Sequence, residues 1–102
     1  MAESFGLSEY TIKTIQTLLQ KYRGIQKVVI YGSRAKGDYR PGSDIDISLY
    51  TDSGFTRDDL ARLRCDFDDS DMPYFVDVSI FSDLTTPALR EHITRLGKPL
   101  LE

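Results

Sequence analysis

Residues 27–50 read KVVIYGSRAKGDYRPGSDIDISLY and carry the pattern that decides the fold. The run at 27–31 is short, mostly apolar and β-branched, which predicts a buried strand. Gly32-Ser33 breaks that strand, and the residues before Gly37 have room for only about one helical turn. From 44 to 50 polar and apolar residues alternate, which predicts a second, half-exposed strand.

Periodicity and capping residues outside this stretch predict the remaining elements. Thr56 with Asp59 forms a shorter variant of the capping box, and residues 40–43 (RPGS) suit a type II turn. The predicted order is a helix over 8–22 capped by Ser8, a strand over 27–31, a helical turn after 33, a strand over 44–50, a helix from 56, a strand over 74–81, a helix opened by Thr86-Pro87 and a short terminal strand at 100–101. This order predicts an α/β (α+β) fold with a small sheet backed by helices.

Length and composition limit the class of protein. The 102 residues predict a single domain spanning 1–102, and 13 Lys and Arg against 16 Asp and Glu give a net charge of −3. That balance disfavours coating of nucleic acid or of an anionic membrane. Cys65 is the only cysteine, which excludes an intrachain disulfide. Since there is no signal-peptide pattern and no apolar run of about 20 residues, the expected location is the cytoplasm.

The acidic residues concentrate in 41–83, where eleven Asp stand against three Arg. Caps and loops account for most of these aspartates, but not for Asp44, Asp46 and Asp77. Asp44 and Asp46 share one face of their predicted strand, and Asp77 alternates with Val76 and Val78 in the same way.

If the two strands are neighbours, the three carboxylates converge on one side of the sheet. Carboxylates that close raise one another's pKa unless a cation is present, and Asp oxygens are what Mg²⁺ or Mn²⁺ prefer. A solvated strand face is the alternative, and the alternation by itself leaves both interpretations open.

Gly32-Ser33 supplies a second chemical feature. Glycine lets a ligand approach the backbone, while the amides of the following turn, the Ser33 hydroxyl and the charges of Arg34 and Lys36 can hold a phosphate. A plain strand-to-helix turn is the alternative, and the spacing is neither that of a P-loop nor GxGxxG. The two features together suit a nucleoside triphosphate with its metals.

The segments 32–37 (GSRAKG), 40–47 (RPGSDIDI) and 70–78 (SDMPYFVDV) resemble the motifs of the polymerase-β-like nucleotidyltransferases. More narrowly, the chain resembles the minimal nucleotidyltransferases, the MntA-type antitoxins paired with HEPN-domain toxins. The resemblance covers about residues 25–100. It implies a palm fold, a small mixed sheet with helices on one face, and contacts of Gly32 and Ser33 with the triphosphate.

The same resemblance implies roles for the other site residues. Asp44 and Asp46 would bind two Mg²⁺ ions (Mn²⁺ being the alternative), and Asp77 would bind one metal and help to activate the acceptor hydroxyl. These three would be the catalytic residues. Arg34 matches a basic position of the motif and is expected to make a supporting phosphate contact.

By resemblance, the expected function is Mg²⁺-dependent transfer of AMP from ATP to a partner protein, a tyrosine of a HEPN toxin, by an antitoxin. The alternative is a non-catalytic binding module that neutralises its partner by stoichiometric occlusion. Transfer to RNA ends fits the acidic balance poorly, and no membrane partner is expected.

The remaining side chains suit structural roles. His92 is expected on a solvated helix face, and the tyrosines mostly in the core or in an interface. Exposed apolar surface on so small a domain would mark a partner or oligomer interface, so a homo-oligomer remains an open option.

Overall fold

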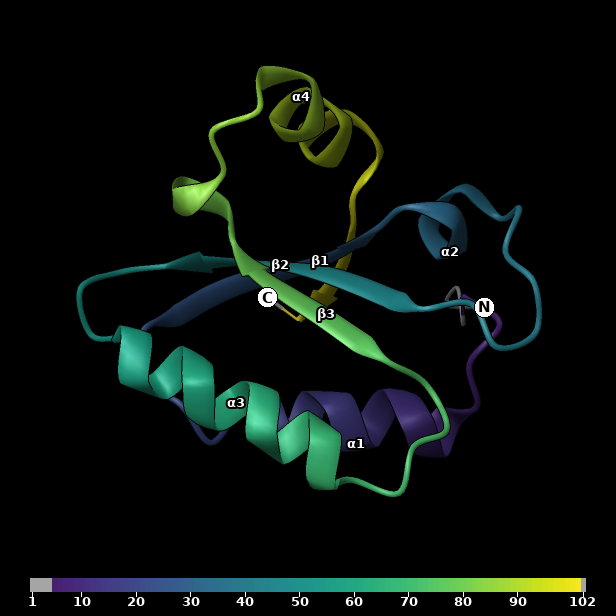
Figure 1. Ribbon diagram of the computed structural model, residues 1–102, viewed down its shortest axis with the longest axis horizontal. Helices are drawn as coiled ribbons and strands as arrows, with labels where there is room; N and C mark the ends of the chain where they lie inside the picture. Colours follow the sequence, from purple (N-terminus) through teal and green to yellow (C-terminus); the bar gives the residue numbers. More distant parts are fainter. Residues whose placement is uncertain (1–4, 102) are drawn as a thin grey trace.

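The computed structural model describes residues 5–101. The elements are α1 (Glu9–Leu19), β1 (Ile25–Tyr31), α2 (Ser33–Lys36), β2 (Ile45–Thr51), α3 (Arg57–Asp69), β3 (Val76–Ile80), a 3-10 turn η1 (Phe81–Asp83), α4 (Pro87–Leu96) and β4 (Lys98–Leu101) (Figure 1). Each predicted element is present, the first helix being shorter than predicted at its C-terminal end. Within residues 5–101, no helix combines the length and apolarity that crossing a bilayer requires.

The four strands form one mixed sheet in the order β3-β2-β1-β4. β1 runs antiparallel to both β2 and β4, while β3 lies parallel to β2. Parallel neighbours need a crossover connection, and α3 supplies it between β2 and β3. The mixed sheet confirms the fold class expected from the sequence.

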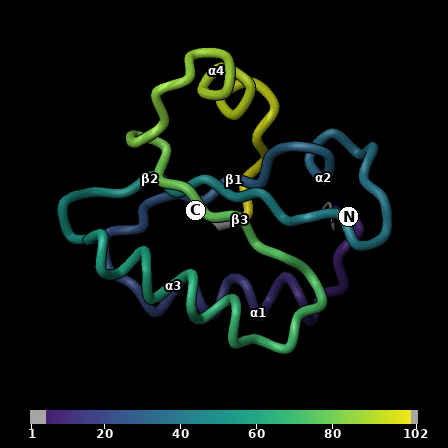
Figure 2. The backbone as a smooth tube through the Cα atoms, in the orientation of Figure 1, coloured from purple at the N-terminus to yellow at the C-terminus, as the bar shows by residue number. Residues whose placement is uncertain are grey.

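The helices cover both faces of the sheet. Figures 1 and 2 show α1 and α3 side by side under one face and α4 over the other. The main core lies between the sheet and α1 and α3. Its members include Ile15, Leu19, Val28, Ile30, Ile45, Ile47, Leu49, Leu60, Leu63, Phe67, Val76, Val78 and Ile80.

The expectation of helices on one face therefore holds for α1 and α3, and α4 departs from it. Val29 points away from the main core and is buried, as is Ile93 of α4. A Cβ atom on Gly97, at the end of α4, would lie 3.2 Å from Cγ2 of Val29. Because β1 is apolar on both faces, it needs cover on both sides, and α4 gives it the second.

Capping bonds fix two of the helix starts. Thr56 and Asp59 form the predicted capping box, with each backbone N–H donating to the other side chain at 3.0 Å. The Ser8 hydroxyl accepts from the N–H of Thr11 at 3.1 Å. Thr86 makes no side-chain capping bond, and α4 starts instead with Pro87 in its first turn.

Candidate active site

The strand register brings two of the predicted catalytic carboxylates side by side. Asp46 of β2 pairs with Asp77 of β3, and on its other side with Tyr31 of β1. Paired residues of neighbouring strands point to the same face, so these three side chains form a row across the sheet. The row lies on the α4 face, opposite the main core. Asp77 is exposed and Asp46 is half-buried.

Asp44 lies just before β2 and is exposed. The turn that precedes it has the predicted type II form, with a φ of +86° at Gly42 and the Ser43 N–H donating to the Arg40 carbonyl at 3.0 Å. The first bond to β3 follows at once, from the Ile45 N–H to the carbonyl of residue 75 at 2.9 Å. Asp44 therefore stands at the same end of the sheet as Asp46 and Asp77.

Gly32 forms the junction between β1 and α2 directly beside this row. Its φ of +74° and ψ of −153° lie in a region that only glycine adopts readily. A Cβ atom there would lie 2.7 Å from Oδ2 of Asp46. The Gly32-Ser33 segment is thus in contact distance of a carboxylate, as expected if one ligand engages both.

The electrostatics of the row favour a cation. The pKa of Asp46 is raised, first by burial and then by the charges of Asp77 and Asp44. No ion pair found among residues 5–101 includes any of these three aspartates. Their repulsion is therefore not offset by a neighbouring Lys or Arg of the described chain.

The donor chemistry fits a hard divalent ion, since all three side chains offer carboxylate oxygens. As they stand in residues 5–101, however, no three His, Cys, Asp or Glu side chains are grouped closely enough to hold a metal ion. Binding of an ion would require the carboxylates of Asp44, Asp46 and Asp77 to turn toward one another. The metal role of these residues remains a prediction.

Arg34 is buried, with 3% of its surface exposed. Its guanidinium donates to the Phe5 carbonyl at 2.8 Å and twice to the Ser43 carbonyl, at 3.1 and 2.8 Å. It also lies over the rings of Tyr39 and Tyr74, at 5.3 and 4.8 Å from their centroids. These contacts tie α2 to the turn before Asp44, so the described role is positional. The expected phosphate contact remains a prediction.

Sequence reasoning did not place three residues, Tyr31, His92 and Phe75, at this face. Tyr31 completes the row, and its pKa is raised first by burial, with Asp46 and Asp77 adding to the shift. His92 is half-buried rather than solvated, with its ring edge-on to Tyr31 at 6.2 Å. Phe75 is 59% exposed, and its spacing of two from Asp77 was a signal that could have placed it on this face. No such signal existed for Tyr31, because its neighbours depend on strand pairing.

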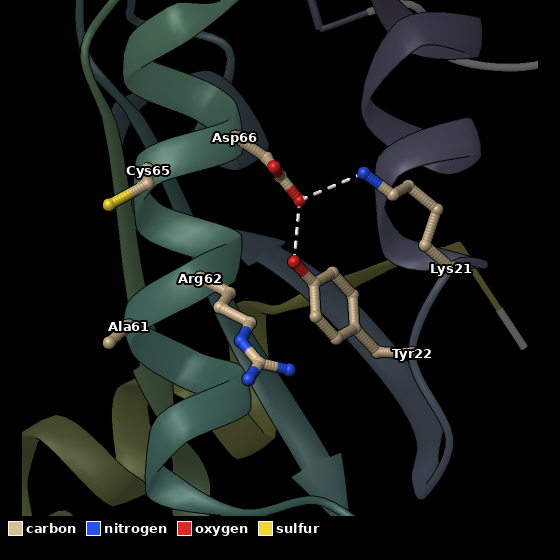
Figure 3. A pocket seen from close by; sticks show the side chains of 6 residues that line it. All are labelled: Lys21, Tyr22, Ala61, Arg62, Cys65 and Asp66. Carbon is tan, nitrogen blue, oxygen red and sulfur yellow. Dashed lines mark hydrogen bonds and ion pairs between the residues drawn. The ribbon is translucent and has the colours of Figure 1, made fainter.

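A surface cavity of about 480 Å³ lies elsewhere, between α3 and the end of α1. Its lining residues are Lys21, Tyr22, Ala61, Arg62, Cys65 and Asp66. Figure 3 shows Tyr22 and Lys21 converging on Asp66, with bonds of 2.5 and 3.3 Å, while Cys65 points away from them. Burial and the hydrogen bond to Asp66 raise the pKa of Tyr22 to about 12, and the same hydrogen bond lowers the pKa of Asp66. The cavity adjoins the helices of the core face, so it is separate from the carboxylate row.

The fold and the carboxylate row place the chain among the nucleotidyltransferases. The chain belongs to the family described as polymerase beta nucleotidyltransferases, whose sequence model matches residues 13–102. This family assignment confirms the resemblance drawn from the segments GSRAKG and SDIDI.

One relative shares substantial sequence. Over 56 residues the chain is 48% identical to the "Putative protein adenylyltransferase MJ0604" of Methanocaldococcus jannaschii. The match covers 54% of this chain and 52% of the relative, so the chain spans about half the length of the curated relative it matches.

Solved structures share the fold. A "Crystal structure of the toxin-antitoxin with AMP-PNP" superimposes with a TM-score of 0.73 at 23% identity, covering 88% of this chain and 72% of the other. A "Structure of putative minimal nucleotidyltransferase" gives a TM-score of 0.68 at 28% identity, covering 88% of this chain and 89% of the other.

Proposed function

We propose that this protein transfers AMP from ATP to a hydroxyl of a partner protein, a tyrosine of a HEPN-domain toxin, and acts as its antitoxin in the cytoplasm. The observation that carries the proposal is the pairing of Asp46 with Asp77 beside Gly32. Support comes from the relative named as a protein adenylyltransferase and from the fold shared with a toxin–antitoxin structure that contains AMP-PNP.

In this proposal the triphosphate lies along the Gly32-Ser33 segment. Gly32 has no side chain between its backbone and Asp46, so phosphate oxygens can approach both. The Ser33 hydroxyl donates to the phosphates. Arg34 acts through the Ser43 carbonyl, holding the turn that places Asp44.

Asp44, Asp46 and Asp77 would hold two Mg²⁺ ions, with Mn²⁺ as a substitute. Bound there, the ions would offset the negative charge of the phosphates and of the leaving pyrophosphate. The unpaired, mutually repelling carboxylates are the feature of this chain that suits such ions.

The transfer is a single displacement at phosphorus. The tyrosine oxygen of the partner bonds to the α-phosphorus, the bond to the β-phosphate oxygen breaks, and pyrophosphate leaves. Asp77 takes the phenolic proton. Because Asp77 is exposed on an outer strand of the sheet, a side chain of a second protein can reach it.

The direct test is label transfer from α-³²P-ATP to a co-expressed HEPN protein in the presence of Mg²⁺. We expect labelling of the partner by the wild-type chain and none by the double variant Asp44→Asn, Asp46→Asn. The matched control is Asp68→Asn, Asp69→Asn, which removes the same charge at the exposed end of α3. Labelling that persists in the first double variant would refute the site.

Neutralisation of the toxin separates transfer from occlusion. If the Asp44→Asn, Asp46→Asn variant neutralises the partner as well as the wild type does, without ATP, the protein acts by stoichiometric occlusion. If neutralisation is lost together with labelling, the transfer reaction is the antitoxin activity.

A further inference from the structure

One apolar aromatic side chain stands exposed beside the carboxylate row. Among residues 5–101, the large hydrophobic side chains that are exposed to solvent are Tyr10, Tyr39 and Phe75. The Tyr10 hydroxyl donates to Asp71, and the guanidinium of Arg34 lies over the ring of Tyr39. The Phe75 side chain, 59% exposed, has no ring contact or cation–π contact in the described part of the chain. Its ring is therefore open to packing by another molecule.

The chain on either side holds Phe75 outward. Tyr74 packs against the core, with Arg34 over its ring at 4.8 Å, and Val76 is buried. The Phe75 carbonyl accepts from the N–H of Ile45 at 2.9 Å. Because successive side chains of an extended chain point to opposite sides, these two inward neighbours direct the Phe75 ring outward. The exposure of the ring thus follows from a backbone that is anchored on both sides.

Phe75 flanks the carboxylate row on its outer side. The pairing of Ile45 with Val76 places Phe75 opposite Asp44, and Phe75 shares a face with Asp77. Residues two apart on a strand lie about 6.5–7 Å from each other, and packed aromatic rings have centroids about 4.5–7 Å apart. A phenol ring that packs against Phe75 can therefore bring its oxygen to the Asp77 carboxylate.

The order of the strands separates the two ends of the proposed reaction. β3 is an outer strand, and β2 lies between it and β1, which leads into the Gly32-Ser33 segment. Neighbouring strands lie about 4.8 Å apart, so Phe75 stands roughly 10 Å from the line of β1. In a displacement at phosphorus, the attacking and leaving oxygens lie roughly in line. With pyrophosphate leaving on the Gly32-Ser33 side, the acceptor arrives from the β3 side, where Phe75 stands.

We propose that Phe75 binds the ring of the acceptor tyrosine of the partner protein and thereby favours a phenol over an aliphatic hydroxyl as acceptor. The inference rests on the proposed function and adds a specificity-determining residue on its acceptor side. Aromatic pairs contribute more than their buried area alone, and a serine or threonine acceptor gains none of this. The adenine of the donor is the other planar group in the reaction, so the test includes it.

The first measurement is the affinity of the full chain for the HEPN protein of the labelling test, by calorimetric titration without nucleotide. In Phe75→Leu we expect the affinity to weaken by about tenfold, and in Phe75→Tyr, which keeps the ring, by less than about twofold. The matched control Tyr10→Leu replaces an exposed aromatic side chain on α1 and should change the affinity by less than about twofold. Because both side chains are exposed, these substitutions should leave the chain folded.

A double-mutant cycle identifies the group that Phe75 contacts. Each tyrosine of the HEPN protein is changed to leucine in turn, and the affinity of each variant is measured with the wild-type chain and with Phe75→Leu. For the acceptor tyrosine we expect the two changes to be non-additive, so that Phe75→Leu weakens binding of that variant by less than about twofold. The tyrosine found in this way should be the one that carries the label after AMP transfer.

The outcomes separate this inference from the proposed function. The inference is overturned by absence of binding, by an affinity that is unchanged in Phe75→Leu or equally weakened in Tyr10→Leu, or by coupling to no tyrosine or to an unlabelled one. Weaker AMP-PNP binding in Phe75→Leu, with unchanged affinity for the HEPN protein, would assign the ring to the adenine and overturn it as well. Coupling to a tyrosine without any AMP transfer counts against the proposed function alone. Transfer by the wild type that does not depend on Phe75 counts against this inference alone.

Discussion

A methyl group on Gly32 would lie 2.7 Å from Oδ2 of Asp46, closer than such atoms can approach. The backbone of Gly32, with φ +74° and ψ −153°, is itself unsuited to other residues. We therefore expect Gly32→Ala to lower the free energy of unfolding by about 1–3 kcal/mol, chiefly from backbone strain, and to push the Asp46 carboxylate aside. Urea denaturation measures the loss, and AMP transfer is expected to fall below detection.

Gly37→Ala is the control for backbone strain without a contact to a site residue. Gly37 also has a positive φ, +91°, but a Cβ there would meet nothing within 4 Å. The Gly37→Ala variant should lower the free energy of unfolding by only about 1 kcal/mol, from backbone strain, and leave AMP transfer intact. Equal losses of AMP transfer in the two variants would show that displacement of Asp46 is unimportant.

The strand faces were predictable from the sequence, because strict alternation over 44–50 and 76–80 leaves one choice of side for each aspartate. The position of α4 was missed, although the unbroken apolar run over 28–30 implied a strand covered on both faces. The burial of Arg34 could not be predicted. Its partner carbonyl on Phe5 is 29 residues away, and beside a Gly-Ser turn an arginine suggests a phosphate ligand.

Asp46 links metal binding to stability. Its pKa is raised by burial, then by Asp77 and Asp44, so the folded state holds the proton more tightly than the unfolded state does. Stability without metal should therefore fall as pH rises above the usual aspartate pKa of about 3.8–3.9. At pH 7 without metal, we expect Asp46→Asn to raise the free energy of unfolding by on the order of 1 kcal/mol.

Added Mg²⁺ should make the wild type more stable than the Asp46→Asn variant. At about 100 times its Kd, a ligand that binds only the folded state stabilises it by about 2.7 kcal/mol, so the melting temperature of the wild type should rise. Asp46→Asn should not respond, whereas Asp68→Asn should respond like the wild type. A melting temperature of the wild type that is insensitive to Mg²⁺ would contradict the metal role.

Arg34 is expected to act mainly through stability. Arg34→Lys cannot reach both the Phe5 and Ser43 carbonyls and loses the flat contact with two tyrosine rings. The free energy of unfolding should fall by about 1–3 kcal/mol, against less than about 0.5 kcal/mol for the exposed neighbour in Arg40→Lys. Titration with AMP-PNP well below the melting temperature distinguishes a positional role of Arg34 from a direct phosphate contact. A direct phosphate contact predicts an affinity loss of about tenfold or more for folded Arg34→Lys, and a positional role predicts much less.

The bond between Tyr22 and Asp66 predicts a pH-dependent contribution to stability on the face away from the site. The pKa of Asp66 is lowered, chiefly by this bond, so its stabilisation is present above the usual aspartate pKa and is lost as pH falls below it. The pKa of Tyr22 is raised to about 12 by burial and by Asp66, so its stabilisation is present below pH 10 and is lost as pH rises from 10 to 12.

We expect Tyr22→Phe to lower the free energy of unfolding by about 1–2 kcal/mol between pH 5 and 9, with the difference from the wild type shrinking in both acid and strong base. The control is Tyr10→Phe, which removes a hydroxyl that donates a long, exposed hydrogen bond to Asp71, at 3.4 Å. Urea denaturation of the three proteins from below the usual aspartate pKa of 3.8 up to pH 12 measures both effects. A difference between wild type and Tyr22→Phe that stays constant over this whole range would show that the bond contributes nothing to the pH dependence.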